Sequence, residues 1–129
     1  MIGRLVPIKR FDLAIKALGK LKEEGLNIKL QIAGSGPLEK ELQSLISRLE
    51  LEKEVELLGF RNDIAQLLKE SSIYLICSDL EGVPTALLEA LSLRVPSIAT
   101  AVGGIPEVIE TLPKGSCILT TPNLSLIHI

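Results

Sequence analysis

The sequence is poor in aromatic residues. Its 129 residues include no tryptophan, one tyrosine and two phenylalanines. Proteins that bind single-stranded nucleic acid stack the bases on aromatic side chains, and such a platform is missing here. The charge points the same way, because 14 basic residues stand against 16 acidic ones, for a net charge of −2. A nucleic-acid-binding domain would show a basic surface instead, so we expect no nucleic-acid partner.

Cysteine and histidine are also scarce. Cys77 and Cys117 both lie in apolar runs typical of strands, which favours buried free thiols in a reducing compartment over a disulfide. The one histidine, His128, leaves no Cys/His set with metal-ligand spacing and no other candidate for a Ser/His/Asp triad. No apolar run approaches the ~20 residues of a membrane span. We expect no metal site and a cytoplasmic protein, with the inner face of the membrane as an alternative location for its full-length form.

Short apolar runs alternate with amphipathic segments along the whole chain. The apolar runs predict strands at 28–33, 55–58, 73–77, 97–100 and 116–119, and residues 1–5 predict the end of another. The segments between them predict helices at 14–21, 38–49, 64–68, 85–93 and 105–110. Asp12 is the predicted N-cap of the first helix and Gly25 its C-terminal stop, Pro37 begins the second, and Asn62 or Asp63 leads into the third.

Strands that are apolar throughout and alternate with helices indicate a parallel sheet covered on both faces. With right-handed crossovers this is a doubly wound, Rossmann-like α/β domain. Ligands of such sheets bind outside the carboxyl ends of the strands. The loops expected at that edge are 4–9, 34–37, 59–63, 78–85 and 101–106.

The stretch from Glu81 to Glu89 carries the most chemical information. The chain turns at Gly82 and enters a helix through Pro84, and a helix N-terminus suits phosphate because its N–H groups are unpaired. Glu89 follows Thr85 by one turn, ~6 Å along the axis, and carboxylates accept hydrogen bonds from sugar hydroxyls. Thr85 and Glu89 could equally belong to a polar strip of the helix that only faces water. The residues alone therefore leave open whether this helix binds a ligand or only faces solvent.

Two cations and a glycine turn are further candidates. Arg4 and Lys9 follow the first predicted strand and suit a diphosphate, although plain surface cations are the simpler interpretation of their chemistry. The turn at 34–37 is neither a dinucleotide fingerprint, because Glu39 occupies the third glycine position, nor a P-loop. A tight turn is therefore favoured for it over backbone approach to a ligand.

Five pieces of the sequence resemble family 4 of the retaining glycosyltransferases, which have the GT-B fold. Glu81 and Glu89, with seven residues between them, resemble the E-x7-E motif of that family. The other four pieces follow the family's order: 3–7 with Lys9, 32–37, 58–64 and 103–107. The resemblance runs from Gly3 to Leu119 and implies the C-terminal domain, which binds a nucleoside-diphosphate sugar.

The resemblance also implies roles for single residues. Arg4 and Lys9 would hold the diphosphate, Glu81 would contact the donor sugar and Glu89 the ribose hydroxyls, and Arg4, Lys9 and Glu81 would be the catalytic set. The remaining donor-binding residues would be Gly34, Gly36, Phe60, Arg61, Gly82, Val83, Pro84, Thr85 and Ala86. No cofactor and no metal would be needed, and UDP is the expected nucleotide because the family uses it often. Arg10 replaces the family's usual glycine, which puts the local turn in question.

The resemblance makes residues 1–123 an incomplete donor-binding domain, inactive without an N-terminal acceptor domain of the same polypeptide. Residues 124–129 match the peptide encoded by a common transposon-end sequencing adapter read through in frame, with a native apolar tail as the alternative. We expect Arg4, Lys9, Glu81 and Glu89 to converge on one cleft at the carboxyl edge of the sheet. A non-catalytic nucleotide-sugar-binding module and a sugar-nucleotide epimerase of GT-B architecture remain alternative functions.

Overall fold

The computed structural model describes residues 1–121, which divide into two compact units. Unit 1 is Met1–Arg61, and the described part of unit 2 is 62–121. The predicted adapter tail and His128 lie outside the described residues. Each unit is an α/β arrangement with parallel strands, which confirms the predicted fold class unit by unit.

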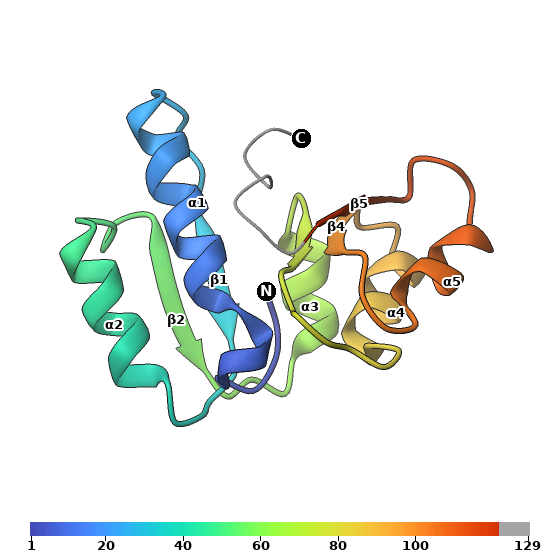
Figure 1. Ribbon diagram of the computed structural model, residues 1–129, viewed down its shortest axis with the longest axis horizontal. Helices are drawn as coiled ribbons and strands as arrows, with labels where there is room; N and C mark the ends of the chain where they lie inside the picture. The colour runs from blue at the N-terminus through green and yellow to red at the C-terminus, as the bar shows by residue number, and fades with distance from the viewer. Residues whose placement is uncertain (122–129) are drawn as a thin grey trace. The chain divides into compact units, whose positions relative to one another are not determined.

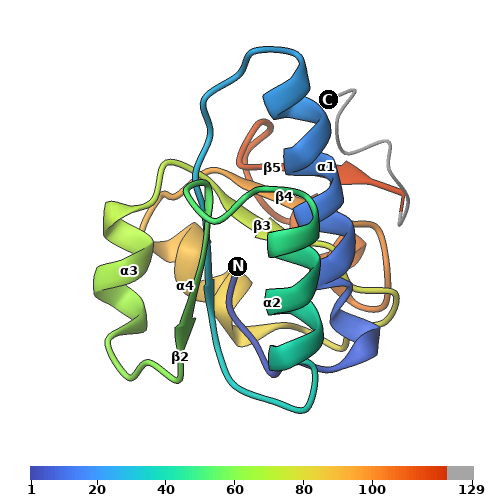
Figure 2. The same cartoon turned by 90° about the vertical axis from the view of Figure 1, so that its left-hand side faces the viewer.

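Unit 1 contains two parallel strands and two helices that contact each other (Figures 1 and 2). Its elements are η1 (Pro7–Lys9), α1 (Phe11–Glu23), β1 (Leu30–Ala33), α2 (Glu39–Arg48) and β2 (Val55–Gly59). Leu30 of β1 pairs with Val55 of β2, and the N-terminal segment joins β1 through one parallel bridge between Ile2 and Ala33. The core is a buried apolar cluster of Leu5, Phe11, Ile15, Leu18, Ile32, Leu42, Leu45, Ile46, Leu51 and Val55.

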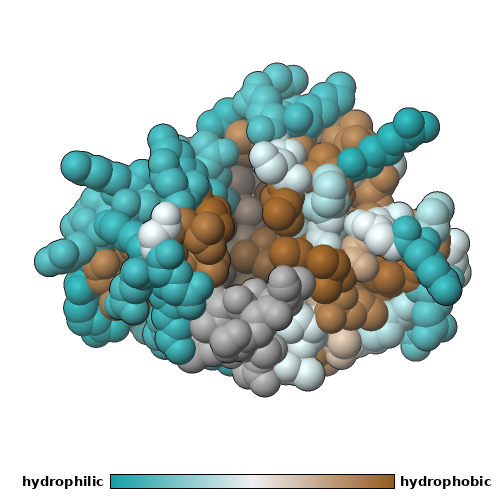
Figure 3. All heavy atoms as spheres, turned by 90° about the horizontal axis from the view of Figure 1, so that it is seen from above, coloured by the Kyte–Doolittle hydropathy of each residue, from teal (hydrophilic) through white to brown (hydrophobic). Residues whose placement is uncertain are grey.

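The apolar spacing of the helices explains this core. The buried side of α1 includes Ile15 and Leu18, and the buried side of α2 includes Leu42, Leu45 and Ile46, which is the three-to-four-residue period of an amphipathic helix. Charged residues such as Lys16 and Lys20 remain exposed. Hydrophilic side chains accordingly dominate the part of the surface view where α1 and α2 lie (Figure 3).

Unit 2 repeats the strand–helix alternation. Its elements are α3 (Ile64–Glu70), β3 (Tyr74–Ile76), α4 (Thr85–Ser92), β4 (Ser97–Thr100), α5 (Ile105–Glu110) and β5 (Cys117–Thr120). The strands lie in the order β3-β4-β5 and are all parallel (Figure 2). Tyr74 pairs with Ser97 and Ser97 with Cys117, so consecutive strands are neighbours and each connection contains a helix.

Several predicted boundaries need correction. The N-cap of α1 is Arg10 rather than Asp12, because the preceding 3-10 turn delivers the chain into the helix two residues earlier. Pro37 lies in a turn, and α2 begins at Glu39 after Leu38 as N-cap. In the strand end predicted at 1–5, only Ile2 pairs with the sheet, through an isolated bridge to Ala33. Asp63 is the N-cap of α3, one of the two residues predicted, and Gly25 follows the end of α1 as predicted.

The two cysteines are free thiols, as predicted. Cys77 is buried, whereas Cys117 is only partly buried, because β5 has β4 as its one strand neighbour in the described sheet. Within residues 1–121, no helix is long and apolar enough to cross a membrane.

Candidate functional site

The predicted glycine turn of unit 1 lies directly against the N-terminal segment. The N–H of Leu5 donates to the Ser35 carbonyl at 3.0 Å. A Cβ atom at Gly34 would lie 1.8 Å from the Gly3 carbonyl oxygen, and one at Gly36 would lie 2.6 Å from the Leu5 carbonyl oxygen. No side chain fits at either position, so both glycines are explained by close approach within the chain. The sequence predicts a tight turn here, and the structure adds that this turn packs against the N-terminal segment.

The backbone that this turn holds carries the two predicted cations. Arg4 lies between Gly3 and Leu5 and its side chain is exposed. Lys9 is partly buried at the end of η1. Its side chain lies beside Gly3, because a Cβ atom added to Gly3 would be within 4.0 Å of Lys9 Cδ and Cε. Both predicted cations therefore lie on the short N-terminal segment that the glycine turn holds in place.

The turn after Lys9 is formed even though Arg10 stands where the family usually has glycine. Its backbone has φ 50 and ψ 44, in the left-handed region that glycine favours. The N–H of Arg10 donates to the Pro7 carbonyl and closes η1, and the N–H of Leu13 donates to the Arg10 carbonyl at the start of α1. The turn beside Lys9 is thus present although the residue is arginine.

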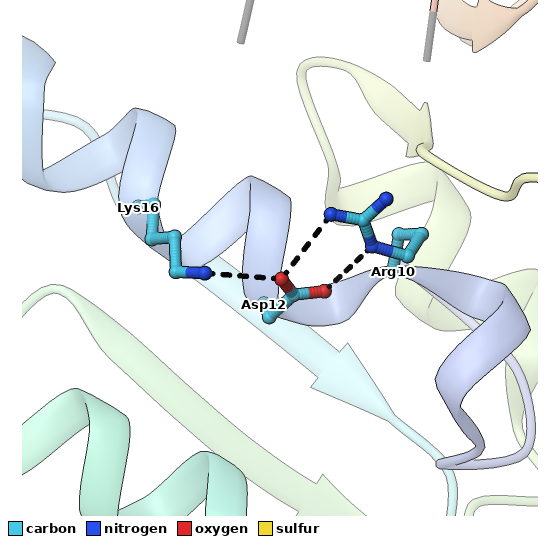
Figure 4. A network of polar contacts seen from close by, with 3 residues as sticks. All are labelled: Arg10, Asp12 and Lys16. Atoms are coloured by element: carbon cyan, nitrogen blue, oxygen red, sulfur yellow. Dashed lines mark hydrogen bonds and ion pairs between the residues drawn. The ribbon is translucent and has the colours of Figure 1, made fainter. Parts of the chain in front are cut away.

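The Arg10 side chain is tied to α1 through Asp12 (Figure 4). Arg10 Nε lies 3.1 Å from Asp12 Oδ1, and Lys16 Nζ lies 3.2 Å from Asp12 Oδ2. Partial burial by itself raises the pKa of Asp12, but hydrogen bonds from Arg10 and Lys16 and their charges outweigh it, so the pKa is lowered overall. This network stabilises the first turn of α1 next to Lys9.

Phe60 and Arg61, two of the predicted donor-binding residues, follow β2 at the end of unit 1. Phe60 is 79% exposed, which is unusual for a large apolar side chain and leaves its ring open to a ligand. The N–H of Gly34 donates to the Gly59 carbonyl at 2.7 Å. The residue before Phe60 is therefore fixed to the same glycine turn that holds the N-terminal segment.

In unit 2, the predicted phosphate-binding loop leads into α4. Pro84 is its N-cap and makes no side-chain capping bond, so the N–H groups of Thr85 and Ala86 receive no capping oxygen from it. Thr85, Glu89 and Ser92 are all exposed on this helix. Val83 and Gly82 are exposed as well, which leaves the loop backbone accessible to a ligand.

Glu81 is fixed by a buried polar network that sequence reasoning missed. The Ser78 hydroxyl donates to Glu81 Oε1 at 2.6 Å, and the Thr100 hydroxyl donates to the Ser78 carbonyl at 2.7 Å. Ser78 and Thr100 are 2% and 0% exposed. A polar residue at the end of each apolar run was the available signal, but 22 residues separate the two. They come together because β3 and β4 pair in parallel, with Ile76 opposite Ala99.

Gly103 and Gly104, which lie in the 103–107 piece of the family resemblance, pack against the backbone of the same loop. A Cβ at Gly103 would lie 1.6 Å from the Glu81 carbonyl oxygen, and its φ is +56. The N–H of Gly104 donates to the Gly82 carbonyl at 3.1 Å. The loop is therefore held twice, through the side chain of Glu81 and through the backbone of residues 81 and 82.

The electrostatic environment of Tyr74 includes both glutamates of the E-x7-E pattern. Burial raises the pKa of its hydroxyl, and the negative charges of Glu81 and Glu89 raise this pKa further. Both carboxylates therefore lie within electrostatic range of one phenol. Glu81 and Glu89, which the resemblance to the E-x7-E motif pairs, both act on this phenol within unit 2.

Arg4 and Lys9 thus belong to the N-terminal segment of unit 1, and the charges of Glu81 and Glu89 both act on Tyr74 in unit 2. The convergence of the cations and the carboxylates on one cleft stays a prediction, because the two units are described separately. Within the described residues there is no cluster of three or more His, Cys, Asp or Glu side chains that could hold a metal ion.

Comparison with known proteins decides the family. The family model of the glycosyl transferases group 1 matches residues 1–123. The chain belongs to this family. Among its relatives is the putative colanic acid biosynthesis glycosyltransferase WcaL of Escherichia coli K12, 35% identical over 122 residues that are 88% of this chain and 30% of that protein. The amylovoran biosynthesis glycosyltransferase AmsK of Erwinia amylovora is 37% identical over 117 residues, 84% of this chain and 29% of AmsK.

Solved glycosyltransferases share the fold. The crystal structure of Anabaena HepE in complex with UDP and glucose matches with a TM-score of 0.84 and 29% identity, over 98% of this chain and 35% of HepE. The structure is that of the Rossmann-like C-terminal domain of GT-B glycosyltransferases. This chain spans about a third of the length of these relatives.

Proposed function

We propose that this chain is the donor-binding half of a retaining glycosyltransferase that transfers a sugar from a nucleoside-diphosphate sugar. The family match over residues 1–123 carries the proposal. It is supported by the likeness to Anabaena HepE, whose crystal structure contains UDP and glucose. The named relatives of colanic acid and amylovoran biosynthesis support an acceptor on the route to a polysaccharide.

In this proposal Arg4 and Lys9 neutralise the diphosphate leaving group. Negative charge on its oxygens grows as the glycosidic bond breaks, so fixed cations stabilise the transition state more than the bound donor. The N–H groups of Thr85 and Ala86 and the positive end of the α4 dipole suit the same phosphates. The charge is balanced without a metal ion, and no cofactor is required.

The carboxylates and the β2 loop recognise the rest of the donor. Glu81 accepts hydrogen bonds from the sugar, and Glu89 accepts them from the ribose hydroxyls. Phe60 and Arg61 contact the base, which we propose to be uracil, and the turns at Gly34, Gly36 and Gly82–Pro84 contribute backbone groups. An N-terminal domain of the same polypeptide would bind the acceptor.

The test is an assay of the complete gene product against a panel of nucleotide sugars with polysaccharide-type acceptors. Transfer with retained anomeric configuration, read by NMR of the product, is the expected result. Binding without turnover would instead identify a nucleotide-sugar-binding module, and an isomerised nucleotide sugar without transfer would identify an epimerase. Either of these two outcomes would overturn the proposal.

We also propose that residues 1–123 alone transfer no sugar and bind nucleotide weakly. Positioning of the acceptor and exclusion of water can contribute ~7–11 kcal/mol to lowering a barrier, and a donor domain by itself lacks both. Calorimetry with UDP and product analysis with an added acceptor measure the two properties. Multiple turnovers by the isolated residues 1–123 would contradict this statement.

A further inference from the structure

We infer that Ser78 is a positioning residue for Glu81: its buried hydroxyl fixes the carboxylate that contacts the donor sugar, with Thr100 fixing Ser78 in turn. The inference rests on the proposed function, because it concerns how the proposed sugar contact at Glu81 is oriented. It adds Ser78 and Thr100, which the site predicted from the sequence does not include.

The hydrogen bond from Ser78 is the first step of the argument. Ser78 Oγ lies 2.6 Å from Glu81 Oε1, in the range of a hydroxyl bonded to an ionised carboxylate. Ser78 itself is 2% exposed, whereas Glu81 is partly exposed. The bond therefore joins a rigid interior group to a carboxylate at the surface, which is how a side chain is held in one rotamer while it remains open to a ligand.

The position of Ser78 is fixed from the neighbouring strand. Thr100 ends β4, is fully buried, and its hydroxyl donates to the Ser78 carbonyl at 2.7 Å. The pairing of β3 with β4 brings the two residues together. Because Ser78 immediately follows Cys77 at the end of the β3 run, it inherits the rigidity of the sheet rather than the mobility of a loop.

The backbone of Glu81 is restrained independently. Gly103 approaches its carbonyl so closely that a Cβ would lie 1.6 Å away, and Gly104 donates to the next carbonyl, that of Gly82. With the backbone already held, the remaining freedom of Glu81 is in its side chain. A hydrogen bond at Oε1 removes part of that freedom before the donor binds, so less ordering is left for the binding step.

The experiment compares Ser78→Ala and Thr100→Val with Ser97→Ala in the complete gene product. Ser97 is a matched control, since it is also 2% exposed in unit 2 and its hydroxyl contacts only the nearby Val95 carbonyl among the described bonds. Ser78→Ala should lower kcat/KM about tenfold, the loss typical of a hydrogen bond to a charged group. Thr100→Val should lower it less, and Ser97→Ala should leave it unchanged.

The decisive measurement repeats Ser78→Ala in a Glu81→Ala background, using kcat/KM and the Kd of the nucleotide sugar from calorimetry. If Ser78 acts through Glu81, its replacement causes no further loss there, because coupled residues are not additive. Equal losses in both backgrounds, or none in either, would overturn the inference while the role of Glu81 stands. Full activity of Glu81→Ala would instead refute the proposed role of Glu81 itself, and with it the inference.

Discussion

Unit 1 and unit 2 fix the backbone of their proposed donor-binding residues in the same way, but they differ in how they hold the side chains. In both, a glycine turn lies in contact with the backbone that carries the key residue: Gly34 against Gly3 in unit 1, and Gly103 against Glu81 in unit 2. In unit 2 a buried hydroxyl also holds the functional side chain, whereas the exposed Arg4 has no hydrogen bond or ion pair of its side chain among residues 1–121.

The difference agrees with what each kind of contact requires. A charge–charge interaction with a diphosphate varies slowly with distance, so a cation on a fixed backbone can adjust to its ligand. A hydrogen bond to a sugar hydroxyl depends strongly on direction. Orientation by Ser78 therefore matters for Glu81, while placement of the backbone is sufficient for Arg4.

The largest expected effect is that of Lys9→Ala in the complete gene product. We expect kcat to fall about 100-fold, with a smaller rise in KM, because charge grows on the leaving diphosphate in the transition state. Steady-state kinetics with varied donor concentration separate the two parameters. Lys20→Ala, which removes an exposed lysine of α1, is the control and should change neither. An unchanged kcat with only a raised KM would mean that Lys9 binds donor and transition state equally.

Gly34→Ala and Gly103→Ala test the feature that the two units share, the close approach of a glycine to a backbone carbonyl. Each should lower the free energy of unfolding by more than about 2 kcal/mol, since the new Cβ would overlap a carbonyl oxygen and the backbone has positive φ. Urea denaturation of the 129-residue chain measures the loss.

Matched controls separate the overlap from the strain of positive φ. Gly59→Ala in unit 1 and Gly115→Ala in unit 2 also have positive φ, but no atom lies within 4 Å of the added Cβ. They should cost only about 1 kcal/mol. If the two variants of each unit lose the same free energy of unfolding, the close approach contributes nothing to stability. That result would refute the shared role of the two glycines.

Arg10 and Arg94 allow a finer comparison, because each unit places one arginine in the left-handed region. Arg10→Gly should be more stable than Arg10→Ala by about 1 kcal/mol, and the same order should hold at Arg94. Comparing glycine with alanine removes the arginine side chain from both variants. Thermal unfolding of the four variants measures the differences, and a more stable alanine variant at either position would contradict the backbone argument.

The smallest expected effect concerns Asp12 and pH. Its pKa is lowered in the folded chain, so its contribution to stability is present above the unfolded pKa of about 3.9 and is lost as pH falls through the folded value. The contribution is at most about 1 kcal/mol, because the pair is partly exposed. Between pH 7 and pH 3, wild type should therefore lose more stability than Asp12→Asn in urea denaturation. Parallel curves would show that the network beside Lys9 contributes nothing.

The alternation of apolar runs was sufficient to predict all five strands of the described sheets to within two residues. Helix starts were harder. Asp12 has the chemistry of an N-cap, yet Arg10 takes that position, because the 3-10 turn at 7–9 sets where the helix begins. Capping chemistry is a local preference, and the geometry of the preceding turn overrode it.

The site divides in the same way. The sequence by itself determined the E-x7-E spacing, the cations at positions 4 and 9 and the glycines of the turns, because these are residue types at fixed offsets. Only the tertiary structure decided that Gly34 and Gly103 receive backbone from elsewhere in the chain, and that Thr100 and Ser78 support Glu81. Contacts between residues tens of positions apart depend on which strands pair and in what register, and no local pattern in the chain encodes that choice.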